Sequence, residues 1–363
     1  MMEGQARWFG LVMGFDNRMI AGSRACSTFS PADSPDHHQP VKPALCRGPA
    51  GLLEPAACAH IYDPTCGSGG LLLQCLARAG GQGVNVRSLF LYGQELNPET
   101  WAIARMNMLL HGAGDAAEIK LGDTLASPAF VDGGRIMTFD ILVANPPFSS
   151  KNWGHERLKK SGDPYGRIKH LPSKNHGEMA FLQHMVASMN DGGRLAVVLP
   201  NGCFFRGGAE LAVRKELVDT DLIESIVQLP EDLFYGSGIP ACILVLNRAK
   251  AQDRKGRVLM IDSSIGFQRR ETKNMLTDLA IERAISTYQE GTEEDGLSRW
   301  TTDEEIIVRR YNLTVRRYVG PENDGDRTTL DLGEAIEAYR EAREARERSE
   351  ARLDEVLKML EEQ

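Results

Sequence analysis

Short apolar runs alternate with helical segments along the chain from about residue 60 onward. Regular alternation of this kind predicts a mostly parallel β-sheet with helices on both faces. We therefore predict an α/β fold of the doubly wound, Rossmann-like type, in which ligands bind beyond the carboxyl ends of the strands. The predicted strands are residues 60–63, 89–94, 119–121, 141–144, 194–199, 223–229 and 241–246, and the predicted helices are residues 69–79, 98–111, 178–189 and 209–219.

The two ends of the chain lack this alternation. Residues 1–58 contain repeated prolines, glycines and serines with little periodicity, so we predict an irregular, poorly ordered segment there. The α/β domain is expected at residues 59–265, with a further strand or hairpin outside the core at residues 254–264. Residues 266–329 are expected to form a helical or irregular extension.

Residues 330–363 are rich in Ala, Glu and Arg and are predicted to form one long C-terminal helix. Such a helix is either solvated or makes a coiled-coil contact with another subunit, and both interpretations stay open. The contact is favoured by apolar residues that share one a/d register near the two ends of the helix, namely Leu332, Ile336, Tyr339, Leu353, Leu357 and Leu360.

The composition indicates an ordinary globular protein, with 42% hydrophobic and 25% charged residues. No apolar run approaches the roughly 20 residues that a membrane helix needs, and no secretory signal is evident, so a cytoplasmic location is expected. The seven cysteines are scattered without a CxxC pair, and no HExxH sequence occurs. Neither a disulfide framework nor a metal site is therefore expected.

Charge is distributed unevenly along the chain. The net charge is -8, yet residues 151–176 contain seven Lys or Arg and only two acidic residues. A local basic segment of this kind is either a solvated loop or a contact for an anionic partner such as nucleic acid.

A glycine-rich turn, Asp63-Pro-Thr-Cys-Gly-Ser-Gly-Gly70, follows the first predicted strand and opens a helix. Glycines allow a ligand to approach the backbone, and a helix N-terminus offers free N–H groups. The spacing does not fit GxGxxG, and the Lys of a phosphate-binding loop is missing, so phosphate binding is not favoured. Taken alone, the turn is a weak signal and is equally compatible with a simple tight turn.

A second turn, Asn145-Pro-Pro-Phe148, ends the strand at 141–144. The two prolines fix the backbone and remove two donors, which leaves the Asn145 side-chain oxygen and the Pro146 carbonyl as rigid acceptors. These acceptors suit an amino group, and Phe148 offers a flat face on which a base can stack. A plain strand-ending turn with a buried Phe is the alternative.

Together these motifs resemble the S-adenosylmethionine-dependent amino-methyltransferases of the gamma-ordered adenine class. Further segments resemble, in the family's order, the modification subunit of type I restriction-modification systems: Gly93-Gln-Glu-Leu-Asn-Pro-Glu-Thr-Trp101, Met106-Asn-Met108, His111-Gly112, Gly122-Asp-Thr-Leu125 and His176-Gly-Glu-Met-Ala-Phe181. The resemblance covers about residues 60 to 250. It implies a site-specific adenine-N6 DNA methyltransferase with S-adenosylmethionine as cofactor and residues 59–265 as the methyltransferase domain.

The resemblance also implies a role for individual residues. Asn145, Pro146, Pro147 and Phe148 would hold the target adenine, which must leave the DNA duplex before it can react. Glu95 would accept hydrogen bonds from the ribose of the cofactor, and Asp123 would pair with its adenine amino group. The methionine part would lie against the turn formed by Asp63, Pro64, Thr65, Cys66, Gly67, Ser68 and Gly69.

Partners follow from the same resemblance. Double-stranded DNA would meet the basic segment, a specificity subunit would bind the C-terminal helix, and a restriction subunit would complete the complex. His176 and Glu178 are interpreted as structural or loop-anchoring residues. The expected DNA contacts are Lys151, Arg157, Lys159, Lys160, Arg167, Lys169 and Lys174.

The N-terminal region departs from the family pattern. An N-terminal helical domain and a Gly-Glu-Phe-Tyr-Thr-Pro-like segment that closes over the cofactor are both unrecognisable in residues 1–58. A truncated or altered N-terminus is therefore expected, with weak cofactor binding and low or absent activity for this chain alone. Two alternatives remain open: a catalytically degenerate subunit that only binds the specificity subunit, and an amino-methyltransferase acting on ribosomal RNA or on a release-factor glutamine.

Overall fold

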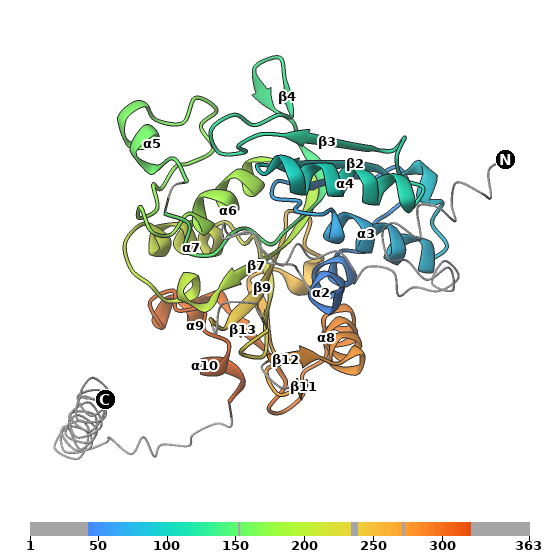
Figure 1. Cartoon of the computed structure of the whole chain (residues 1–363). Coiled ribbons are helices and arrows are strands. Elements are labelled where there is room, and N and C mark those ends of the chain that lie inside the picture. Colours follow the sequence, from blue (N-terminus) through green and yellow to red (C-terminus); the bar gives the residue numbers. More distant parts are fainter. Residues whose placement is uncertain (1–42, 152, 234–238, 271–272, 321–363) are drawn as a thin grey trace, which may run out of the picture. The chain divides into compact units, whose positions relative to one another are not determined.

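A nine-stranded sheet forms the centre of the computed structural model, which describes residues 43–151, 153–233, 239–270 and 273–320 of the 363-residue chain (Figure 1). The strand order is β13-β10-β8-β9-β7-β6-β1-β2-β3. Strands β3, β2, β1, β6 and β7 pair in parallel, as do β8 and β10, whereas β9 and β13 run antiparallel to their neighbours. The strands are β1 (His60–Asp63), β2 (Phe90–Glu95), β3 (Ala117–Leu121), β6 (Phe139–Ala144), β7 (Met189–Pro200), β8 (Ile223–Gln228), β9 (Ala241–Asn247), β10 (Arg257–Asp262) and β13 (Ser298–Thr302). The predicted mostly parallel α/β fold is confirmed.

The strand order reverses between β1 and β6. The chain runs outward from β1 through β2 to β3 and then returns to β6 on the other side of β1. Connections on the two sides of such a switch point leave opposite faces of the sheet, which opens a crevice at the carboxyl ends of the two strands. The fold therefore places its natural ligand site at the ends of β1 and β6.

Alternate residues of the central strands enter two separate apolar cores. Ile61 and Val143 belong to one core, while Tyr62 and Leu142 belong to the other. Successive side chains of a strand point to opposite faces, so runs that are apolar at every position require cover on both faces. The first core is covered by α2 (Pro43–Leu53), α3 (Gly70–Gly81), α4 (Pro98–Leu110) and α8 (Asp278–Glu290), and the second by α6 (Glu178–Ala187), α7 (Ala209–Asp219), α9 (Asp303–Val308) and α10 (Arg316–Val319).

Local signals explain where the helices beside the site begin. The Asn97 side chain accepts hydrogen bonds from the N–H groups of Glu99 and Thr100, and Pro98 occupies the first turn of α4. Both features favour helix initiation. α3 instead begins after Gly69, which has φ 83° and provides no side-chain cap. The N-terminus of α3 is therefore open toward the glycine-rich turn.

Helix α2 corrects the expectation of irregular structure throughout residues 1–58. Four of its side chains are at most 2% exposed, namely Cys46, Ala50, Leu52 and Leu53. The sequence does not predict this helix, because proline and glycine have low helix propensity. In the structure, however, Gly48 and Gly51 let the helix approach the sheet and α8 closely. A Cβ atom on Gly51 would lie 2.2 Å from Ile285 Cδ1. Tertiary packing outweighs the weak helix propensity here.

The C-terminal side of the sheet also differs from expectation. β10, expected outside the core, lies inside the sheet between β8 and β13. β13 belongs to residues 266–329, so the sheet extends into the segment that was predicted to be helical or irregular. A small hairpin of β11 (Phe267–Arg270) and β12 (Lys273–Leu276) precedes α8. The predicted helix at 330–363 lies outside the described residues.

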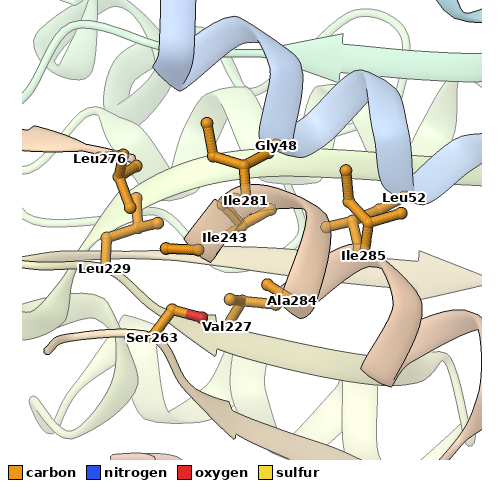
Figure 2. A pocket seen from close by; sticks show the side chains of 11 residues that line it. Gly48, Leu52, Val227, Leu229, Ile243, Ser263, Leu276, Ile281, Ala284 and Ile285 are labelled. Atoms are coloured by element: carbon orange, nitrogen blue, oxygen red, sulfur yellow. The ribbon is translucent and has the colours of Figure 1, made fainter. Parts of the chain in front are cut away.

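A small cavity of about 20 Å³ lies between α2, α8 and the sheet. Figure 2 shows Leu52 of α2 and Ile281, Ile285 and Ala284 of α8 converging on Ile243 and Val227 of the sheet. Ligand pockets usually measure several hundred Å³, and an apolar space of this size stays dry. We interpret the cavity as a packing defect, and none of the predicted site residues lines it.

Shortening Leu52 tests whether α2 is an integral part of the fold. Leu52 is 1% exposed, and Leu52→Val removes one buried methylene beside the cavity. We expect the free energy of unfolding in urea to fall by about 1 kcal/mol. Leu279→Val is the matched control, because Leu279 is 80% exposed on α8. Equal stabilities of the two variants would show that α2 does not pack as described.

Candidate functional site

The two turns that carry the sequence motifs lie side by side at the carboxyl edge of the sheet. β1 and β6 are parallel neighbours whose register pairs Ile61 with Ile141 and Tyr62 with Leu142. The glycine-rich turn follows β1 directly after Asp63, and the second turn follows β6 directly after Ala144. Adjacent strands are about 4.8 Å apart, so the two turns face a shared space at the switch point.

Backbone hydrogen bonds hold the glycine-rich turn in a tight loop. The Cys66 N–H donates to the Gln94 carbonyl (3.0 Å), and the Gly69 N–H donates to the Cys66 carbonyl (2.8 Å). Gly67 and Gly69 have φ values of 55° and 83°, which glycine adopts far more readily than other residues. A Cβ atom on Gly67 would meet nothing within 4 Å. The turn therefore presents bare backbone to the space beside it.

Gly69→Ala should destabilise the domain by about 1 to 3 kcal/mol, from left-handed backbone strain and overpacking together. The new Cβ atom would lie 2.4 Å from Met108 Cε on α4. Gly67→Ala is the matched control, because its added methyl group meets open space and only the strain of about 1 kcal/mol applies. Urea unfolding of both variants measures the difference. A Gly67→Ala variant as unstable as Gly69→Ala would contradict the packing.

Asp63 is a buried carboxyl group with an unused oxygen. Its Oδ1 accepts the Thr65 N–H (3.0 Å), while Oδ2 is buried and has no hydrogen-bond partner. Burial and the nearby charge of Glu95 raise the pKa of Asp63 to about 8. The Thr65 hydroxyl is also buried. It makes no hydrogen bond of ordinary geometry, but its proximity to the Asp63 carboxyl group partly offsets the rise in the pKa of Asp63. Once the Asp63 carboxyl group releases its proton, it and the hydroxyl suit a cationic ligand that donates hydrogen bonds.

Glu95 ties the end of β2 to the glycine-rich turn. Its Oε2 accepts the Gly67 N–H (3.0 Å), its Oε1 accepts the Asn97 N–H (2.8 Å), and the residue is 3% exposed. Each carboxylate oxygen can accept more than one hydrogen bond. The predicted contact with ribose hydroxyls therefore needs the remaining lone pairs of Glu95, and it stays a prediction.

Asp123 organises the turn after β3. Its Oδ1 accepts the N–H groups of Leu125 and Ala126, both at 2.9 Å. The Thr124 hydroxyl donates to the Pro64 carbonyl (2.6 Å), which joins this turn to the glycine-rich turn. Asp123 therefore lies close to the predicted cofactor turn, and its Oδ2 makes no hydrogen bond to another described residue. Its pairing with an adenine amino group stays a prediction.

A buried carboxylate anchors the backbone directly after the Asn145–Phe148 turn. The Glu178 Oε1 atom accepts the Ser149 N–H (2.7 Å), and Glu178 is fully buried at the start of α6. This contact agrees with the loop-anchoring role predicted for Glu178. The Asn145 side chain is half-buried and makes no hydrogen bond within the described ranges, whereas Phe148 packs against the first apolar core. Asn145 thus keeps a free amide at the site.

The basic segment contains a helix, α5 (His155–Ser161), and is folded onto the domain. Trp153 and Leu158 form a small apolar cluster with Leu125, Ala180 and Phe181. This packing orients the segment, so exposure differs strongly among the seven predicted DNA contacts.

Arg167 was predicted to contact DNA, and the structure corrects this. The residue is 3% exposed, and its guanidinium forms an ion pair with Asp163 (2.7 Å). Its other hydrogen bonds go to the Thr124 and Leu125 carbonyls and to the His184 imidazole inside the protein. The sequence could not reveal this burial, because an Arg in a basic segment is usually solvated.

Two other side chains that were predicted to contact DNA already contact groups within the protein. The Arg157 guanidinium donates to the Leu125 carbonyl (2.9 Å), and Lys169 pairs with Glu216 on α7. The side chains that remain exposed without an ion pair to a described residue are Lys151, Lys159, Lys160 and Lys174. For these four lysines, contact with DNA remains a prediction.

Two residues at the site escaped the sequence-based prediction. Leu96, directly after Glu95, is 64% exposed, and an apolar side chain at this place could cover a flat ring. A Leu between Glu95 and Asn97 was a signal that could have been noticed. Thr124 left no such signal, because its contact with Pro64 spans 60 residues of sequence.

Fold and site together define a methyltransferase-like α/β domain. Residues 44–327 match the family model described as N-6 DNA Methylase. The chain belongs to the N-6 DNA methylase family.

Individual relatives agree with this membership. The chain is 37% identical over 303 residues to the type I restriction enzyme MjaVIII methylase subunit of Methanocaldococcus jannaschii, covering 79% of this chain and 50% of that protein. It is 35% identical over 288 residues to the HindI methylase subunit of Haemophilus influenzae, covering 76% and 62%. The chain therefore spans about half to three fifths of the length of these relatives.

Solved structures show the same fold. The methyltransferase subunit of a type I restriction-modification system from Streptococcus thermophilus superposes with a TM-score of 0.69 at 29% identity, covering 78% of this chain and 59% of that one. The EcoKI M protein gives a TM-score of 0.62 at 21% identity, covering 83% and 68%. In the part of the chain that the structure describes, no helix is long and apolar enough to span a membrane, and no cluster of three or more His, Cys, Asp or Glu side chains could hold a metal ion.

Proposed function

We propose that this chain transfers a methyl group from S-adenosylmethionine to the N6 atom of adenine in double-stranded DNA, as the modification subunit of a type I restriction-modification complex. The observation that carries the proposal is the pairing of β1 with β6, because it sets the glycine-rich turn beside Asn145. Membership of the N-6 DNA methylase family supports DNA adenine as the substrate. The names of the relatives support the type I assembly.

The residues at the site fit the proposed cofactor. Asp63 Oδ2 and Thr65 Oγ1, which are buried at the glycine-rich turn, would receive the ammonium group of the methionine part. Leu96 and Asp123 would flank and pair with the adenine part. Bound S-adenosylmethionine would supply an activated methyl group, so the protein needs no nucleophile of its own.

Asn145 and Pro146 would position the target amino group. An extruded adenine offers its N6 hydrogens to the Asn145 side-chain oxygen and to the Pro146 carbonyl. The backbone that carries both acceptors is held in place, because Pro146 is buried and the Ser149 N–H is anchored to Glu178. Orientation and electrostatic stabilisation then provide most of the rate enhancement.

Methyl transfer to competing substrates tests the proposal. The full chain, alone and co-expressed with a specificity subunit, is incubated with radiolabelled S-adenosylmethionine and plasmid DNA, ribosomal RNA or a release factor. We expect N6-methyladenine in the DNA only. Label in RNA or in release-factor glutamine would support the alternative amino-methyltransferases. No label anywhere, together with stable binding of the specificity subunit, would identify a degenerate subunit.

Residues 330–363 are proposed as the contact for the specificity subunit, on the basis of their a/d register alone. A full chain carrying Leu353→Glu and Leu357→Glu should lose co-purification with that subunit but retain cofactor binding. Retained co-purification would contradict this assignment.

Exposed lysines of α5 are expected to contact the phosphate backbone. Replacing Lys159 and Lys160 by Ala should weaken DNA binding and reduce the slope of log affinity against log salt by about 2. Fluorescence anisotropy over a range of salt concentrations measures the slope. Lys169→Ala is the matched control and should change the slope less, because Lys169 already pairs with Glu216. An unchanged slope in the double variant would remove α5 from the DNA interface.

A further inference from the structure

Arg167 uses its guanidinium to join two segments that flank the candidate site. Its Nη1 donates to the Thr124 carbonyl (3.0 Å), and its Nη2 donates to the Leu125 carbonyl (2.9 Å). Nη2 and Nε also bond the carboxylate of Asp163, at 2.7 Å and 3.1 Å. Both partners of this ion pair are 1% exposed at the side chain. A buried charge that is bonded in several directions holds its neighbours in one geometry.

The carbonyl groups that accept hydrogen bonds from Arg167 belong to the turn that carries Asp123. On one side of this turn, the Asp123 carboxylate accepts the N–H groups of Leu125 and Ala126. Thr124 Oγ1 fastens the turn to Pro64, and Gln94 Nε2 donates to the Ser127 carbonyl (3.0 Å). The position of Asp123 therefore depends on these bonds together with those that Arg167 donates to the same turn.

Asp163 and Arg167 also shape the basic segment. The Asp163 carboxylate accepts the backbone N–H groups of Arg167 and Ile168 and so closes the loop after α5. Arg157 of α5 donates to the same Leu125 carbonyl (2.9 Å). Leu125 itself packs in the apolar cluster with Trp153 and Leu158. The segment that carries the exposed lysines is thus fixed to the Asp123 turn.

A third contact links Arg167 to β1. Its Nη1 lies 3.1 Å from His184 Nδ1, and since a guanidinium can only donate, Nδ1 is the acceptor. The imidazole proton is therefore on Nε2, which donates to the Tyr62 hydroxyl (3.1 Å). Burial and the Arg167 charge lower the pKa of His184 to about 3, so this tautomer persists at neutral pH. Tyr62 directly precedes Asp63.

We propose that Arg167 is a positioning residue that couples the cofactor's adenine subsite at Asp123 to the DNA-facing segment 151–176, so that each ligand strengthens binding of the other. The inference rests on the proposed function, because it takes S-adenosylmethionine and DNA as the two ligands. Coupling between two sites is reciprocal, and each ligand changes the affinity of the other by the same factor.

The test compares the full-length wild-type chain with Arg167→Lys. Lysine keeps the charge opposite Asp163, but a single ammonium cannot reach both carbonyls and His184 as a planar guanidinium does. The affinity for S-adenosylmethionine is measured by calorimetry with and without a mixed-sequence DNA duplex. We expect the duplex to tighten cofactor binding by about tenfold in the wild type and by less than about twofold in the variant. Arg135→Lys, at an exposed site on the hairpin of β4 (Val131–Asp132) and β5 (Arg135–Ile136), should behave as the wild type.

Hydrogen exchange provides a readout that does not depend on catalysis. In the wild type, the cofactor alone should slow amide exchange in residues 123–127 and also in residues 155–168, whereas in Arg167→Lys only residues 123–127 should respond. Circular dichroism confirms that the variant is folded, and Arg167→Gln is measured if the Lys variant is not. Equal coupling factors in wild type and variant would overturn the proposal and leave the proposed function intact. A wild type that binds no S-adenosylmethionine would overturn both.

Discussion

Asn145→Ala is expected to lower the rate of methyl transfer by about a thousandfold while changing the affinity for S-adenosylmethionine by less than about twofold. The Asn145 amide makes no hydrogen bond to another described residue, so its removal leaves the fold unchanged. The target amino group loses one of its two fixed acceptors. Single-turnover methylation of DNA and calorimetric titration with the cofactor measure the two quantities separately.

The matched control for this prediction is Asn175→Ala, an exposed Asn in the basic segment. Its transfer rate should equal that of the wild type. If Asn145→Ala retained its rate, or lost rate and cofactor affinity to the same extent, the amide would not be the acceptor at the reacting nitrogen. Thermal unfolding of both variants shows whether an effect on rate comes from a loss of folded protein.

Asp63→Asn is expected to affect binding and stability in opposite directions. Without the carboxylate, the affinity for S-adenosylmethionine should fall by about 10- to 100-fold, because a charge-assisted hydrogen bond to a cation is lost. The free protein should become more stable near pH 8, because the buried group no longer has to ionise. Asn keeps the Oδ1 acceptor for the Thr65 N–H.

The free energy of unfolding of the wild type should change with pH, and the shifted pKa of Asp63 gives the direction of that change. The pKa of Asp63 is about 8 in the folded state, whereas the ordinary pKa of an aspartic acid side chain is 3.8. Between these pH values the folded protein retains a proton that the unfolded chain releases, so stability falls as pH rises from about 4 to about 8. The loss is on the order of a few kcal/mol. Asp63→Asn should remove this slope from urea-unfolding data, and an unchanged slope would show that Asp63 is ionised in the free protein.

The affinity for S-adenosylmethionine should also depend on pH. Below pH 8, cofactor binding requires Asp63 to release its proton, so wild-type affinity should increase with pH up to about 8 and then level off. Asp63→Asn should bind weakly at every pH. Thr65→Ser is a suitable control, because it keeps the buried hydroxyl.

The sequence by itself determined the fold class and the two turns that form the candidate site of this protein. Apolar runs such as residues 141–144 can be buried only between two layers of helices, so they predict a parallel sheet without any knowledge of contacts. The glycine-rich turn and Asn145–Phe148 were readable because each consists of consecutive residues at a strand end. The resemblance to the methyltransferase family rested on the same local motifs.

Only the tertiary structure decided which basic side chains are free. Arg167 and Lys159 are both basic residues of one segment, yet the first is buried against the Thr124 and Leu125 carbonyls and the second is exposed. Helix α2 and strand β13 were likewise missed, because their stability comes from packing against residues distant in the chain. Local patterns report which face of an element is apolar, but the partners of a buried polar group are set by long-range contacts that leave no trace in neighbouring residues.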